Sequence, residues 1–268
     1  MRSNHMNAKI AELLAQLRLR GIADCIEKIL KNADKRGLAT EDVLLELLEA
    51  EYREQQIRSL NNRISHAKFP EEWSLDTFPF NRQPEVNKIQ IMNLAKLNFI
   101  ERHENIIFIG KTGTGKSGLA MGLLRQAILN GYRGRFYDAQ DMLDELYTSL
   151  ADRTTPKLLK KIFNYDLIVI DELGYLNLKT EQVNMFFKLI SMRYGKKPTI
   201  ITTNLAFDEW YDVFKQKELV DALLDRFRHY CNVITINKSS LRTPKSEKND
   251  SSKKKTNAKQ KTTKKRNA

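Results

Sequence analysis

The spacing of apolar positions changes near residue 80 of the chain. Before that point, apolar residues recur at helical spacing in three segments, which predicts a small all-helical domain. The three segments are Lys9–Leu19, Ile22–Lys35 and Glu41–His66. Thr40 is the predicted N-cap of the third helix, because Glu41 and Asp42 follow in the first turn, where the helix dipole favours negative charge.

From Ile106 onward, short β-branched runs alternate with amphipathic helical stretches. The runs read IIFIG, GRFYDA, LIVID, TIITT and VITI in chain order. Because this alternation is typical of repeated βα units, it predicts an α/β fold built on a five-stranded parallel sheet.

A proline-containing segment over residues 70–84 separates the two patterns and predicts an extended linker. Its aromatic residues suggest that it packs back onto the α/β part through Trp73, Phe78 and Phe80. The predicted organisation is a helical domain over 1–69, the linker over 70–84, an α/β domain over 85–242 and a tail over 243–268.

Composition narrows the class of protein. The chain has a formal net charge of +13 with 41% hydrophobic residues, which indicates a soluble globular protein whose first candidate partner is a polyanion. Cys25 and Cys231 lie far apart and outside any CxxC or Cys/His cluster, so we expect neither disulfides nor zinc, and a reducing, cytoplasmic setting. No run approaches the roughly 18 apolar residues of a membrane span, so membrane insertion is not expected.

Two basic regions are candidate contacts to a polyanion. The tail from Thr243 onward has ten basic and two acidic residues and contributes +8 of the net charge, which predicts a disordered segment. It is either a solubilising or non-specific polyanion-binding tail or a nuclear localisation signal. The third helix is either a solvated face or a phosphate-contacting surface of a DNA-binding domain. Its basic residues are Arg53, Arg58, Arg63 and Lys68.

Residues 110–117 read GKTGTGKS and match the pattern G-x-x-x-x-G-K-[ST] between a predicted strand and a predicted helix. Glycines let the backbone close around a triphosphate, so that N–H groups and the helix N-terminus face the anion. Lys116 is expected to reach the β- and γ-phosphates, and Ser117 to bind Mg²⁺. The predicted nucleotide-binding residues are Gly110, Lys111, Thr112, Gly113, Thr114, Gly115, Lys116, Ser117 and Gly118.

The run LIVIDE places two acids at the end of a predicted buried strand, about 55 residues after the phosphate loop. We expect Asp171 to join Ser117 as a Mg²⁺ ligand and Glu172 to polarise the attacking water as general base. Asn204 follows the strand TIITT and is either a polar sensor of the γ-phosphate or a turn-initiating residue. Arg226, beside Arg228 at a helix end, is either an arginine supplied in trans to a neighbouring subunit or a surface cation.

Taken together, these motifs resemble an AAA+ ATPase of the initiator and helicase-loader type. Four runs closely resemble the IstB-type ATPases of insertion sequences, relatives of the DnaC-type helicase loaders. They are DELGYL at 171–176, TTNLAFDEW at 202–210, ALLDR at 222–226 and RISHAKFPEEWSLDTFPF at 63–80. The resemblance spans roughly residues 7 to 242.

The resemblance implies ATP and Mg²⁺ as cofactors, Asn204 as first sensor and Arg226 as arginine finger. It also implies a second sensor at Arg242, although KSSLR at 238–242 lacks the glycine of the family's Gly-x-Ser-x-Arg segment. Lys111 stands where relatives often have proline, outside the set that contacts phosphate.

The function implied by the resemblance is an ATP-dependent DNA-binding helper of transposition in the bacterial cytoplasm. Such a protein hydrolyses ATP, oligomerises on double-stranded DNA, remodels it and recruits the transposase of the same element. The alternatives are a replicative helicase loader with the same ATPase residues, and a nucleotide-dependent binding module in which hydrolysis is incidental.

Overall fold

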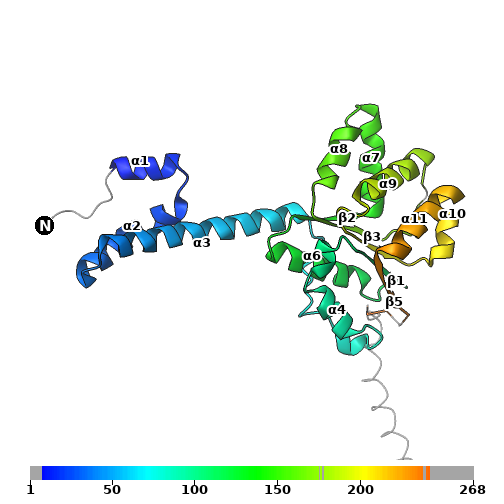
Figure 1. Ribbon diagram of the computed structural model, residues 1–268, viewed down its shortest axis with the longest axis horizontal. Helices are drawn as coiled ribbons and strands as arrows, with labels where there is room; N and C mark the ends of the chain where they lie inside the picture. The colour runs from blue at the N-terminus through cyan, green and yellow to red at the C-terminus, as the bar shows by residue number, and fades with distance from the viewer. Residues whose placement is uncertain (1–7, 175, 177, 238–239, 242–268) are drawn as a thin grey trace, which may run out of the picture.

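Three helices form an arm that projects from an α/β core (Figure 1). They are α1 (Ala8–Gln16), α2 (Arg20–Arg36) and α3 (Thr40–Ala67). The computed structural model describes residues 8–174, 176, 178–237 and 240–241, so the predicted tail and Arg242 lie outside the described residues. The N-cap prediction for Thr40 was wrong by one residue. Ala39 is the cap, because its carbonyl already accepts from the Val43 N–H, 3.2 Å away.

The arm has a small apolar core, and one buried carboxylate links α3 to α2. Gly21 lets α2 approach α3 closely, since a Cβ there would lie 2.6 Å from the Ala50 carbonyl oxygen. Glu51 on α3 is only 4% exposed and accepts hydrogen bonds from the Ile22 N–H and from Arg58. Burial alone raises the pKa of Glu51, but these hydrogen bonds and that from Gln55 outweigh it, so the pKa is lowered.

The core confirms the predicted α/β fold. Its five strands pair in parallel in the order β2-β3-β4-β1-β5. They are β1 (Asn105–Gly110), β2 (Gly134–Asp138), β3 (Leu167–Asp171), β4 (Thr199–Thr203) and β5 (Cys231–Ile236). The carboxyl ends of β1, β3 and β4 are therefore neighbours, and the segments that follow them meet at one edge of the sheet.

Helices cover both faces of the sheet (Figure 1). Alternate residues along a strand belong to two apolar cores, one on each face of the sheet. Ile106 and Phe108 lie in one core and Ile107 lies in the other. The first face carries the end of α3, η1 (Phe80–Arg82), α4 (Lys88–Leu94), α5 (Asn98–Glu101) and α6 (Lys116–Leu129). The second carries α7 (Ala139–Ala151), α8 (Thr155–Phe163), α9 (Thr180–Arg193), η2 (Phe207–Glu209), α10 (Trp210–Phe214) and α11 (Lys217–His229).

The linker packs along α6, as its aromatic residues predict. A Cβ on Gly118 would lie 3.0 Å from the Trp73 ring, and one on Gly122 would lie 2.6 Å from the Leu75 side chain. The linker thus occupies a groove that two glycines leave open on the helix following the phosphate loop. Within the described residues, no helix is both long and apolar enough to cross a membrane.

Candidate nucleotide-binding site

The phosphate loop runs from the end of β1 into the first turn of α6. Gly113 and Gly115 have φ values of +82° and +98°, which L side chains rarely adopt, so the loop's shape requires glycine at both positions. Lys116 is buried, and its Nζ donates to the carbonyl oxygens of Gly110 and Lys111 at 2.7 and 2.9 Å. The loop is therefore a compact backbone turn around an ammonium group, at the positive end of a 14-residue helix. This arrangement fits a phosphate group.

Asp171 and Ser117 form the acidic side of the site. Asp171 ends β3 and is 8% exposed, and its carboxylate accepts a hydrogen bond from the Thr202 hydroxyl, while the nearby Ser117 hydroxyl also favours its charged form. Burial raises the pKa of Asp171 above its ordinary value, and the two hydroxyl donors only partly offset it. A carboxylate next to a hydroxyl supplies the hard oxygen ligands that Mg²⁺ prefers, with phosphate and water completing the shell. The predicted pair Ser117 and Asp171 is thus brought together.

Glu172 is exposed just beyond Asp171 and has an unusual backbone. Its φ is +58°, in the left-handed region that non-glycine residues rarely occupy. Its N–H donates to Thr202 Oγ1 at 3.0 Å, and the next N–H, of Leu173, donates to the Thr202 carbonyl oxygen at 2.9 Å. Sequence reasoning did not single out Thr202, and the only signal was its place two residues before Asn204.

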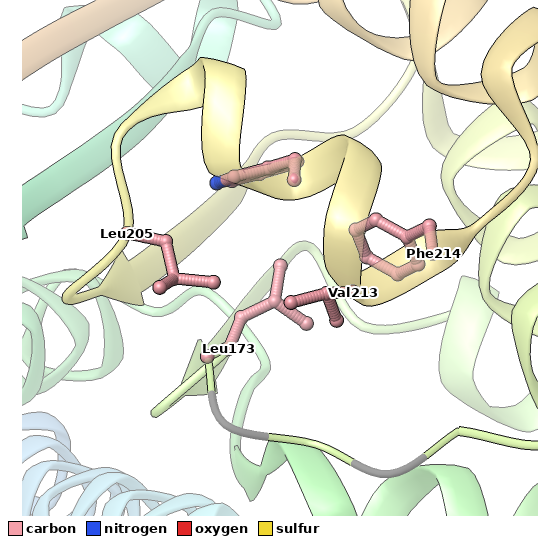
Figure 2. Close-up of a pocket in the computed structure, with 6 residues that line it drawn as sticks. Leu173, Leu205, Val213 and Phe214 are labelled. Carbon is pink, nitrogen blue, oxygen red and sulfur yellow. The ribbon is translucent and has the colours of Figure 1, made fainter.

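The loops after β3 and β4 pack against each other. Asn204 lies against Gly174, where a Cβ would come within 2.1 Å of the Asn204 Oδ1. Figure 2 shows the apolar side of the same junction, where Leu173 and Leu205 face Val213 and Phe214 of α10. This pocket is too small to admit water and exposes no polar surface, so we interpret it as packing that supports the two loops.

Arg226 lies on α11 and contacts α9. Its guanidinium donates to Ser191 Oγ at 2.7 Å and stands 5.8 Å from the centre of the Tyr194 ring. The structure therefore does not bring Arg226 to the phosphate loop of its own chain, and its role as an arginine finger stays a prediction.

Residues 240–241, beyond β5, lie against the phosphate loop. The Leu241 N–H donates to the Gly113 carbonyl oxygen at 2.7 Å, and Arg82 of η1 donates to the Leu241 carbonyl oxygen at 3.0 Å. The Leu241 and Phe78 side chains both lie against Gly115. Arg82 was missed, because its partner is 159 residues away in the sequence. The predicted second sensor, Arg242, follows this segment but lies outside the described residues.

The predicted basic surface on α3 is not gathered on one side. Arg53, Arg58 and Arg63 are spaced by five residues, which turns each about 140° from the last around a helix of 3.6 residues per turn. Arg58 also pairs with Glu51 at 2.9 Å, so part of its charge is neutralised. Lys68 is exposed at the end of the helix.

A more concentrated basic region lies at the opposite edge of the sheet from the phosphate loop. It is a surface pocket of about 400 Å³, here named the basic pocket. Its lining residues are Arg133, Lys157, Lys160, Lys161, Asn164 and Tyr165. In the described part of the chain, Arg133 pairs with Asp166, whereas the three lysines form no ion pair.

Comparisons with known proteins assign the chain to a family. The family profile described as IstB-like ATP binding protein matches residues 12–249. The chain is 33% identical over 237 residues to the ATP-binding protein of insertion sequence IS5376 from Geobacillus stearothermophilus, covering 88% of this chain and 94% of the relative. It is 30% identical over 236 residues to that of IS21 from Pseudomonas aeruginosa, covering 88% and 89%.

Among solved structures, the DnaC helicase loader superposes with a TM-score of 0.53 at 26% identity, over 61% of this chain and 96% of that one. AMPPCP-bound DnaA from Aquifex aeolicus shares the fold, with a TM-score of 0.52 at 20% identity, over 61% of this chain and 50% of that one. The core is thus an AAA+ fold related to initiators and helicase loaders, and the predicted resemblance is confirmed. The chain belongs to the family of IstB-like ATP-binding proteins.

Proposed function

We propose that this protein is a Mg²⁺-dependent ATPase that assembles on double-stranded DNA and helps the transposase of its own insertion sequence. The observation that carries the enzymatic part is the position of Asp171, a buried carboxylate at a strand end that is close to Ser117 of the phosphate loop. The family membership and the names of its relatives, ATP-binding proteins of insertion sequences, support the transposition context.

Each residue of the site takes a role that its geometry permits. Lys116 and the loop N–H groups bind the phosphates, while Ser117 and Asp171 hold Mg²⁺, which would offset negative charge as the phosphoryl group is transferred. Glu172, exposed beside Asp171, accepts a proton from the attacking water, and Asn204 orients that water or senses the γ-phosphate.

Hydrolysis in this proposal requires a second copy of the chain. Arg226 contacts Ser191 rather than its own phosphate loop, so it is available to act on a neighbouring subunit. An arginine supplied in trans can raise hydrolysis by about 10³–10⁵-fold, which would tie turnover to assembly. The resulting homo-oligomer would bind duplex DNA in its ATP state and release it after hydrolysis.

For the DNA contacts we favour the basic pocket over the arginines of α3. The three lysines of α8 lie within two helical turns and lack acidic partners among the described residues, whereas Arg58 is paired. Phosphate contacts of this kind position DNA without reading its sequence. The tail over 243–268 would add further non-specific attraction.

The test of the proposed function compares the parent protein with Glu172→Gln, which removes the base and keeps the ATP-binding residues. We expect the variant to bind ATP, to lose hydrolysis and to stay assembled on duplex DNA. An absence of ATP-dependent assembly on duplex DNA at moderate salt would contradict the proposal, and unchanged function of the variant would favour a binding module in which hydrolysis is incidental.

A replicative helicase loader is the second candidate, favoured by the likeness to the DnaC helicase loader. It would use the same ATPase residues but bind single strands, and its helical domain would bind a helicase. The two candidates therefore separate by the form of DNA that they prefer.

A further inference from the structure

Thr202 makes three hydrogen bonds to three consecutive residues at the end of β3. Its buried hydroxyl donates to Asp171 Oδ1 and accepts from the Glu172 N–H, and its carbonyl oxygen accepts from the Leu173 N–H. Thr202 lies near the end of β4, the strand that separates β3 from β1 in the sheet. One side chain therefore contacts both the carboxylate assigned to Mg²⁺ and the backbone of the residue assigned as base.

The bond to Asp171 restricts how that carboxylate can turn. A carboxylate rotates over a broad range about its last bond, so fixing one oxygen also fixes where the other points. Because Asp171 is also buried, the Thr202 hydroxyl fixes this oxygen inside the protein, close to Ser117. Such support determines whether a ligand presents its oxygen to a metal at the right angle.

The bonds to Glu172 and Leu173 hold a backbone that the chain does not favour on its own. Glu172 has a φ of +58°, and the crowding of its Cβ makes this region unfavourable for an L residue other than glycine. Thr202 binds the N–H on each side of the Glu172 Cα, and the buried Leu173 side chain lies between Leu205 and Val213 (Figure 2). These contacts fix the backbone from which the exposed Glu172 side chain extends.

We propose that Thr202 is a positioning residue for ATP hydrolysis, acting through the orientation of Asp171 toward Mg²⁺ and through the backbone of Glu172. This inference rests on the proposed ATPase function of the same site. It assigns to Thr202 no contact with the nucleotide. The hydroxyl, rather than the volume of the side chain, is the active feature.

The test compares three variants of the full-length chain. Thr202→Val replaces the hydroxyl with a methyl group and removes both side-chain bonds, while Thr202→Ser keeps the hydroxyl. Thr199→Val is the matched control, because Thr199 is a buried threonine at the other end of the same strand whose hydroxyl accepts from Arg193 Nε at 3.1 Å, away from the site. Thermal unfolding of all three measures the loss of stability that a buried hydroxyl causes in this strand.

Two further readouts separate positioning from stability. Binding of a fluorescent ATP analogue is measured with Mg²⁺ and with EDTA, and steady-state hydrolysis gives kcat and KM. We expect Thr202→Val to match the parent in EDTA, to lose most of the gain in affinity that Mg²⁺ provides, and to have a kcat lower by about ten- to a hundredfold, as for one lost hydrogen bond to a charged group. Thr202→Ser should restore both quantities, and Thr199→Val should leave them unchanged.

Specific results would overturn the inference. It is wrong if Thr202→Val keeps the Mg²⁺ gain and a kcat close to that of the parent, if Thr202→Ser is as impaired as the valine variant, or if Thr199→Val is equally impaired. Failure of the proposed function is a different result, in which the parent itself neither binds the analogue nor hydrolyses ATP.

Discussion

The basic pocket gives a quantitative prediction for DNA binding. Lys157, Lys160 and Lys161 are exposed on α8 and form no ion pair within the described residues, so all three are available to phosphate oxygens. The perturbation is the triple change of these lysines to glutamine, which removes their charge and keeps most of each side chain's length.

Counterion release sets the expected magnitude. Each phosphate contact adds about 0.9 to the slope of log K against log salt, so three lost contacts reduce that slope by about 2.7. Between about 50 and 200 mM salt, the parent should lose about fortyfold more affinity than the triple variant. The difference appears as a change in slope, which distinguishes lost phosphate contacts from a general loss of folded protein.

Fluorescence anisotropy on a duplex, repeated over a range of salt concentrations, measures this slope. The control changes Lys28, Lys31 and Lys35 of α2 to glutamine, which lowers the net charge equally but on the exposed face of the arm. The assignment of the basic pocket to DNA would be refuted if the α8 variant kept the salt slope of the parent. It would also be refuted if the α2 control lost as much slope as the α8 variant.

Three other predictions concern the arm, the linker and the subunit contact. The hydrogen bonds to Glu51 lower its pKa below the ordinary value of 4.5, so they stabilise the arm above that pH and are lost as the pH falls further. The protection of the Ile22 N–H, which is the slowing of its exchange relative to the unfolded chain at the same pH, should therefore decrease at low pH and, at neutral pH, in Glu51→Gln. Equal protection in variant and parent at neutral pH would contradict this. Gly122→Ala places a Cβ 2.6 Å from the Leu75 side chain. The clash should outweigh the gain in helix propensity and destabilise the protein by up to ~2 kcal/mol in urea denaturation. An unchanged unfolding midpoint would argue against close packing of the linker on α6. Arg226→Ala and Lys116→Ala should each be inactive alone and regain ATPase activity when mixed, which would not happen if Arg226 acted within its own chain.

The features that the sequence predicts are those carried by contiguous residues. The phosphate loop and the strand before Asp171 are local patterns, and the alternation of strands with helices indicates a parallel sheet without knowledge of strand order. Asp171 and Ser117 meet because motifs at the ends of parallel strands converge at one edge. This part of the site could be predicted.

The contacts that sequence reasoning missed depend on which segments become neighbours. Thr202 reaches Asp171 only because β4 lies beside β3, and Arg82 reaches Leu241 only because the linker and residues 240–241 lie against the same loop. Arg193 is a similar case, since its fully buried guanidinium donates to the backbone carbonyls of Ile162 and Tyr165, 31 and 28 residues earlier in the chain. Burial of an arginine on backbone carbonyls leaves no pattern in the sequence.

Arg53, Arg58 and Arg63 stay predicted DNA contacts, although they do not share one face of α3. Their composition suggested one basic surface, but a spacing of five residues distributes them around the helix, and the buried Glu51 neutralises part of the charge. Charge counted along a helix is informative only when its angular position is counted with it.

Fluorescence anisotropy of matched double- and single-stranded DNA tests whether the protein is an ATPase that acts on duplex DNA. It is measured with ATP, with ADP and without nucleotide, and Glu172→Gln holds the ATP state. We expect cooperative binding that requires ATP and prefers the duplex. Preference for single strands, or no DNA binding without another protein, would contradict it and favour a helicase loader.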